Sequence, residues 1–90
     1  MVHYEITIKG RVQGVGFRQF VKQKALDFGI KGWVKNMPDG SVLVKAEASE
    51  KDMEPFVDHL RRGPSMSRVD NFLKDKMNVT SGFSDFGIKY

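Results

Sequence analysis

The sequence predicts an α+β fold in which two helices cover one face of an antiparallel β-sheet, in the order β-α-β-β-α-β with a short extra strand at the end. Apolar residues alternate with period two in several short segments, as half-buried strands require. Two other segments carry apolar residues at helical spacing, and glycine and proline separate the segments. Because the chain has 90 residues, we expect residues 1–90 to form a single domain.

The first strand and the first helix flank a glycine-rich stretch. Residues 3–9 alternate in polarity and predict a half-buried strand. After residues 10–16, apolar residues recur at helical spacing, and Gly29 is well placed to end the helix in a left-handed conformation. Leu26 falls on the far side of the helix, where we expect it to be partly exposed. The apolar stripe of this helix consists of Phe17, Phe20, Val21, Ala25 and Phe28.

The next two strands form a predicted hairpin. Residues 31–37 make a short strand, and residues 42–48 alternate in polarity as the following one. Pro38-Asp39-Gly40 lies between them and is a strong turn signal, because proline presets φ and glycine accepts a positive φ. We therefore expect the two strands to pair as a hairpin.

A second helix and two further strands complete the chain. Ser49 opens the second helix, and Asp52 stands three residues on, close to a capping box. Pro55 is awkward in a helix interior and is tolerated if the helix begins near Asp52. Gly63-Pro64 ends it. The strand over residues 69–79 has a blurred alternation, and its adjacent apolar pair predicts a β-bulge. This pair is Phe72 and Leu73, and the short terminal strand is marked by Phe86, Ile88 and Tyr90.

This order of elements is that of the ferredoxin-like split βαβ fold. Right-handed crossovers place the first two strands parallel to each other, with the third strand between them. The carboxyl ends of the first two strands then lie at the same edge of the sheet. We therefore expect residues 12–18 and Asn36 to come together there.

Composition and charge narrow the classes of function. The chain has no cysteine, which excludes disulfides and cysteine-ligated zinc and favours a reducing compartment. The 15 basic and 11 acidic residues give a net charge of +4, which fits an anionic partner and also ordinary solubility. No apolar run has the length of a signal peptide core or a membrane span, so we expect a cytoplasmic protein without a membrane partner.

No pattern predicts a metal site or a nucleophilic triad. His3 and His59 are far apart, and no Asp, Glu and His spacing matches a ligand set. We therefore expect no metal and no cofactor. The carboxylates of the second helix form a solvated face that comprises Glu50, Asp52, Glu54 and Asp58.

The stretch from Gly14 to Arg18 predicts an anion site, because it leaves a strand and enters a helix. The first N–H groups of a helix lack internal partners, and a glycine-rich bend lets several of them point at one anion. The helix dipole disfavours a cation in the first turn unless an anion lies beside it, and arginine binds phosphate bidentately. The alternative is a plain tight turn with a solvated Arg18. The stretch lacks the glycine patterns of dinucleotide sites and Walker A loops.

Asn36 is the second candidate. Its carboxamide offers a donor and an acceptor without charge, so it can hold a water molecule in line with a bound phosphorus. The alternative is that Asn36 caps the turn of the hairpin. These residues by themselves leave both alternatives open.

Two stretches resemble the signatures of the acylphosphatase family. Residues 10–18 read GRVQGVGFR and resemble the first signature. Residues 32–42 read GWVKNMPDGSV and resemble the second, G-x-V-x-N-x-x-D-G-x-V. The resemblance covers nearly the whole chain and implies hydrolysis of the carboxyl-phosphate bond of acyl phosphates, without metal or cofactor. Further matches are Gly63-Pro64, Val69-Asp70 and the closing Phe86-x-Ile88-x-Tyr90.

The resemblance also implies roles for individual residues. Arg18 matches the phosphate-binding arginine, and Asn36 matches the asparagine that orients the attacking water. Gln19 stands where an aromatic or small residue is frequent in the family, and it is expected to affect substrate preference. Inorganic phosphate or sulfate should compete with the substrate, and the protein should be a monomer. The backbone N–H groups that match the phosphate cradle are those of Gln13, Gly14, Val15, Gly16, Phe17 and Arg18.

Two other functions remain to be weighed. RNA recognition motifs share this order of elements, and residues 15–21 faintly resemble their aromatic signature. That signature must lie on the third strand, whereas here it spans a loop and a helix start, and residues 42–48 contain no aromatic residue. We therefore expect no nucleic-acid partner. A non-catalytic acylphosphatase-like domain is the third possibility, and the presence of both Arg18 and Asn36 argues against it.

Overall fold

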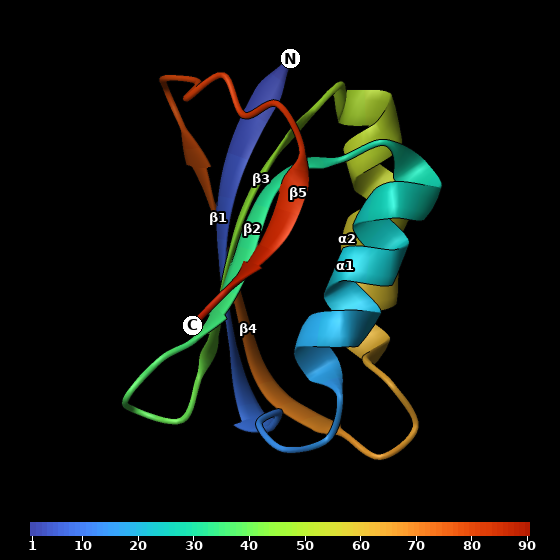
Figure 1. The fold of residues 1–90 in the computed structure, drawn as a ribbon, viewed down its shortest axis with the longest axis vertical. Coiled ribbons are helices and arrows are strands. Elements are labelled where there is room, and N and C mark those ends of the chain that lie inside the picture. The colour runs from blue at the N-terminus through green and yellow to red at the C-terminus, as the bar shows by residue number, and fades with distance from the viewer.

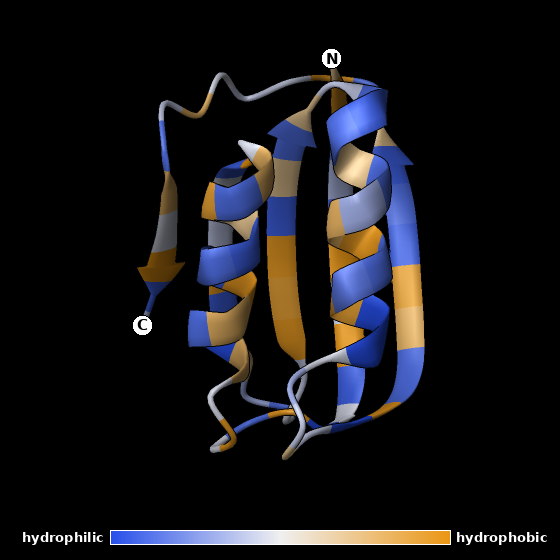
Figure 2. Ribbon diagram, turned by 90° about the vertical axis from the view of Figure 1, so that its right-hand side faces the viewer, coloured by the Kyte–Doolittle hydropathy of each residue, from blue (hydrophilic) through white to orange (hydrophobic).

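Two helices lie side by side on one face of a five-stranded sheet, as predicted (Figures 1 and 2). The structure is a computed structural model that describes all of residues 1–90. Neither helix has the length and apolar character that crossing a membrane requires. In chain order the elements are β1 (Val2–Arg11), α1 (Phe17–Phe28), β2 (Lys31–Asn36), β3 (Val42–Ala48), α2 (Glu50–Arg62), β4 (Arg68–Met77) and β5 (Phe86–Lys89).

The strand order is β4-β1-β3-β2-β5. Both β1 and β2 pair antiparallel with β3, so they run parallel to each other with β3 between them, as the sequence predicts. The last strand, β5, pairs parallel with β2, which makes the sheet mixed and corrects the expectation of an antiparallel sheet. The reason is the crossing segment, residues 78–85, which leaves β4 at one edge of the sheet and enters β5 at the other.

Glycines at both ends set the bounds of α1. Gly16 precedes the helix with φ 77°, and Gly29 follows it with φ 70°, so both adopt the left-handed conformation that glycine tolerates best. The N–H group of Gly29 donates to the carbonyl of Ala25, which closes the last turn. Leu26 is 60% exposed, in agreement with its predicted position opposite the apolar stripe.

The second helix opens at Ser49, as the sequence predicts. The hydroxyl of Ser49 accepts a hydrogen bond from the Asp52 N–H at 3.2 Å, so Ser49 is the N-cap and the helix starts at Glu50. Pro55 therefore lies inside α2, and the alternative of a start near Asp52 is wrong. Proline removes the donor for the carbonyl four residues earlier, and that residue, Lys51, is exposed to water. The cap and the acidic first turn stabilise this start.

The predicted bulge in β4 is displaced by two residues. The register with β1 shifts opposite Gly10, where Asp70 is the extra residue, whereas Phe72 and Leu73 alternate normally. Gly10 has φ 132°, and a Cβ atom there would collide with the carbonyl oxygen of Arg68. The close approach of the two backbones at this glycine explains why the irregularity lies there.

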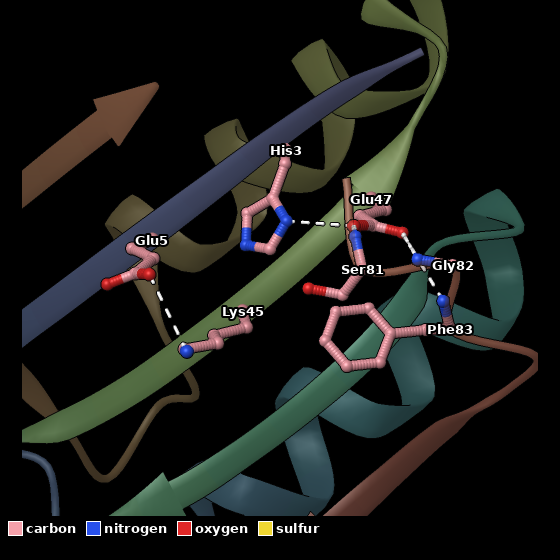
Figure 3. Close-up of polar contacts among 7 residues, drawn as sticks. All are labelled: His3, Glu5, Lys45, Glu47, Ser81, Gly82 and Phe83. Carbon is pink, nitrogen blue, oxygen red and sulfur yellow. Dashed lines mark hydrogen bonds and ion pairs between the residues drawn. The ribbon is translucent and has the colours of Figure 1, made fainter. Parts of the chain in front are cut away.

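Glu47 anchors the crossing segment on the sheet face that the helices leave open (Figure 3). The Nδ1–H group of His3 donates to its carboxylate at 2.8 Å. The backbone N–H groups of Ser81, Gly82 and Phe83 donate to the same carboxylate. Burial raises the pKa of Glu47, but the hydrogen bonds outweigh burial and hold the pKa below its ordinary value. The segment that leads to β5 is thus held by a buried anion.

Candidate active site

The loop between β1 and α1 has an open outer surface. Gly14 and Gly16 both have a left-handed backbone, with φ 74° and φ 77°. No atom lies within 4 Å of the position that a Cβ would take at either glycine. The N–H groups of Gly14, Val15 and Gly16 make no hydrogen bond within the protein. Together with the start of α1, they are donors suited to an anion.

Arg18 and Asn36 line the same cleft beside this loop, as the topology predicts. Arg18 lies in the first turn of α1, and Asn36 is the last residue of β2. The cleft contains about 370 Å³ of empty space that opens to solvent. Neither a carboxylate side chain nor a histidine lines it. Its lining residues are Val12, Gly14, Gly16, Phe17, Arg18, Gln19, Asn36, Ile88 and Tyr90.

The guanidinium of Arg18 has no acidic partner. None of the ion pairs in the structure includes Arg18. Its Cζ atom lies 4.8 Å from the centre of the Tyr90 ring, a cation–π contact of the kind worth about 0.5–1 kcal/mol at an exposed site. The arginine side chains that hydrogen-bond within the protein are those of Arg62 and Arg68, so the N–H donors of Arg18 remain available to an anion.

The side chain of Asn36 does not cap the hairpin turn. Its Oδ1 atom is buried and accepts no hydrogen bond within the protein. Asp39 caps the turn instead, because its Oδ1 accepts from the Ser41 N–H at 2.9 Å and from the Ser41 hydroxyl at 2.6 Å. These hydrogen bonds hold the pKa of Asp39 below its ordinary value. A buried acceptor without a partner is costly, which is typical of a functional site.

Two of the residues predicted for the cradle do not line the cleft. The side chain of Gln13 turns toward the hairpin between β2 and β3, where it donates to two backbone carbonyls. Val15 packs against the hydrophobic core. The sequence also missed Ile88 and Tyr90 as cleft residues, although their alternation predicted the strand that brings them there. Gln19 lies at the cleft, in line with its predicted effect on the substrate.

No group of three or more metal-ligating side chains comes together anywhere in the structure. The segment that resembles an RNA-binding signature lies in the loop and in α1, and its first aromatic ring, Phe17, is buried under the helix. It presents no stacking surface on the sheet, so the RNA-binding alternative loses the observation that favoured it.

Comparisons with known proteins agree with the geometry. A model of the acylphosphatase family matches residues 4–88. The acylphosphatase of Geotalea uraniireducens is 42% identical over 85 residues, which cover 94% of this chain and 93% of the relative. The crystal structure of acylphosphatase from Bacillus subtilis superimposes with a TM-score of 0.97 at 39% identity and covers both chains completely.

A larger protein contains a similar domain. The crystal structure of full-length HypF in its phosphate- and nucleotide-bound form matches with a TM-score of 0.92 at 34% identity. That match covers 99% of this chain and 12% of HypF. The family match over nearly the whole chain, the curated relatives of similar length and the shared fold lead to one conclusion. The chain belongs to the acylphosphatase family and is an enzyme that hydrolyses acyl phosphates.

Proposed function

We propose that the cleft binds the phosphoryl group of an acyl phosphate and directs a water molecule held by Asn36 at its phosphorus. The proposal rests on the presence of three groups at one cleft. A loop with open N–H groups, an arginine without an acidic partner and a buried carboxamide oxygen without a partner border one cleft.

The loop and Arg18 bind the phosphoryl oxygens. Of the predicted cradle, Gly14, Gly16, Phe17 and Arg18 line the cleft, and their N–H groups supply neutral donors at the positive end of the α1 dipole. The Arg18 side chain supplies a full positive charge. Charge-assisted hydrogen bonds of this kind are shorter and stronger than neutral ones. These donors are in place before the substrate binds, so they also stabilise the charge distribution of the transition state.

Asn36 acts on the water. Its Oδ1 accepts a hydrogen bond from the water, which leaves a lone pair of the water oxygen directed at the phosphorus. A bond forms between the water oxygen and phosphorus while the bond from phosphorus to the acyl oxygen breaks. Positioning the water in this way replaces a bimolecular encounter with a reaction inside the complex.

The leaving group explains why the cleft needs no acidic side chain. The products are a carboxylate and inorganic phosphate, and a carboxylate leaves without protonation because a carboxylic acid is a much stronger acid than an alcohol. The proton of the attacking water passes to an oxygen of the substrate's own phosphoryl group, since no carboxylate or histidine lines the cleft. Hydrolysis therefore uses positioning and charge rather than general acid–base catalysis by side chains.

Hydrolysis of benzoyl phosphate in excess chelator tests this proposal. Because no step needs a metal, the rate in EDTA should equal the rate without it. Activity that disappears with EDTA and returns with magnesium or zinc contradicts the proposal. The monomeric state that we expect, with residues 1–90 as the single domain, can be checked on the same sample by light scattering.

A further inference from the structure

We infer that the side chain of Gln13 positions Asn36, by tying the phosphate loop to the hairpin that carries Asn36. The inference rests on the proposed function, in which Asn36 holds the attacking water. The Nε2 atom of Gln13 donates to the carbonyl of Met37 at 2.8 Å and to that of Ser41 at 2.9 Å. This role of the side chain is separate from that of the Gln13 backbone N–H in the phosphate cradle.

The two carbonyls flank Asn36 and its partner on the neighbouring strand. Asn36 pairs with Val42, which is the last pair of the β2–β3 ladder before the turn. Met37 directly follows Asn36, and Ser41 directly precedes Val42. The N–H group of Met37 also donates to the carbonyl of Ser41 at 2.8 Å. Gln13 therefore holds the hairpin at the two residues adjoining the pair that places Asn36.

No backbone pairing connects the loop to the hairpin. The ladder between β1 and β3 ends at the pair Ile8 and Val42, and beyond it β1 pairs only with β4. The two bonds from Gln13 are the only polar contacts between residues 12–18 and residues 36–41. The sheet connects Asn36 to β1 through Val42, which pairs with both Asn36 and Ile8. The Gln13 side chain adds the direct polar link between the loop and the hairpin, and we infer that it fixes the position of Asn36 relative to the bound phosphoryl group.

A glutamine suits this position for a chemical reason. A primary carboxamide carries two N–H donors on one nitrogen, so it can serve two carbonyls at once without adding charge beside an anion site. Glutamate has no such donor, and lysine adds a charge. Methionine has a similar length but no donor. The substitution Gln13→Met thus removes both bonds and leaves the backbone N–H of the loop intact.

Kinetics of Gln13→Met test the inference. We expect kcat on benzoyl phosphate to fall about 10- to 100-fold, the cost of misplacing a reacting group by roughly 1 Å. KM and the inhibition constant of inorganic phosphate should stay nearly unchanged, because the loop donors remain. Gln23→Met is the matched control, since Gln23 lies on α1 and bonds only to the exposed Asp27. This control should keep the wild-type kcat, and circular dichroism melting curves establish that the variants are folded.

A double-mutant cycle separates this inference from the proposed function. If Gln13 acts through Asn36, Gln13→Met should cost little further kcat when Asn36→Ala is already present. If Gln13→Met lowers kcat by the same factor in the wild type and in Asn36→Ala, the inference is overturned. A folded Gln13→Met variant with wild-type kcat overturns it as well. Wild-type kcat in Asn36→Ala instead overturns the proposed function. Gln13→Asn keeps both donors on a shorter stem, so it should retain more kcat than Gln13→Met. Gln13→Leu, which likewise has no donor, takes the place of Gln13→Met in the cycle if the methionine variant does not fold, and the same outcomes then decide.

Discussion

At the scale of single residues, the placement of Arg18 is costly unless an anion binds beside it. A cation in the first turn of a helix opposes the dipole by about 0.3–1 kcal/mol. The structure gives this cation no carboxylate partner, and only the Tyr90 ring lies against it. In the proposed complex a phosphoryl group binds between the helix end and the guanidinium, which removes the conflict.

The substitution Arg18→Ala should raise KM and lower kcat together, since the charge meets the phosphoryl group throughout the reaction. A lost charge-assisted hydrogen bond is worth about 1.5–3 kcal/mol, so kcat/KM should fall about 10- to 150-fold. Steady-state hydrolysis of benzoyl phosphate measures kcat and KM for the variant and the wild type. Arg62→Ala is the matched control, because Arg62 is exposed in the last turn of α2 and does not line the cleft. Equal kcat/KM for the two variants contradicts the role of Arg18.

Residue patterns predicted Arg18 and Asn36, and topology predicted that they meet. Sequence patterns and topology did not predict the side-chain contacts that show whether Asn36 caps the turn or faces the cleft. That Asp39, and not Asn36, caps the turn depends on side-chain rotamers in the folded hairpin. Gln13 hydrogen-bonds to Met37, which is 24 positions away in the chain, and to Ser41, which is 28 positions away. No local sequence pattern indicates contacts over such separations.

At the scale of elements, the crossing segment decides where β5 lies and hence which residues close the cleft. Alternation in the sequence predicted β5, but strand pairing is a tertiary property, so its parallel partner β2 was not predicted. The buried pair of His3 and Glu47 was missed for the same reason, because 44 positions separate the two residues. Local signals, by contrast, predicted the bounds of β3 and the glycine end of α1.

The Glu47 anchor predicts how stability depends on pH. Its pKa is lower in the folded state than the ordinary 4.5, so the stabilisation is fully present above about pH 4.5 and is lost as the pH falls through the folded value. Glu47→Gln should lower the free energy of unfolding at pH 7 by about 1.5–3 kcal/mol, the worth of a hydrogen bond to a charged group. Thermal melts between pH 7 and pH 3 should show the wild type and the variant converging toward acid pH.

A neighbouring carboxylate provides the control for this prediction. Glu5 pairs with Lys45 at 3.6 Å on the same face of the sheet but is half-exposed (Figure 3). Exposed pairs contribute about 0–1 kcal/mol, so Glu5→Gln should change the melting temperature little at any pH. If the melting temperatures of the wild type and Glu47→Gln differ by the same amount at every pH, Glu47 does not stabilise the fold as a charged group.

At the scale of the whole molecule, the fold joins two sequence segments at one edge of the sheet and leaves there the cleft that we propose to be an anion site. A ligand that binds only the folded state stabilises it, by about 2.7 kcal/mol at a concentration 100 times its Kd. In a domain of this size, each kcal/mol raises Tm by about 4–8 °C. Inorganic phosphate should therefore raise Tm, with a shift that grows logarithmically at concentrations above its Kd, and it should inhibit hydrolysis competitively. Sodium chloride at equal ionic strength is the control, and an equal shift with chloride contradicts a specific anion site.

In the proposed mechanism one cleft binds the phosphoryl group through Arg18 and holds the water through Asn36. The kcat of a folded Asn36→Ala variant at saturating benzoyl phosphate tests it most directly. We expect kcat to fall on the order of 10²–10³-fold, as for the loss of a preorganised polar group. KM should be nearly unchanged, because in the proposed mechanism Asn36 contacts the water and not the substrate. A folded Asn36→Ala variant that keeps the wild-type kcat contradicts the account.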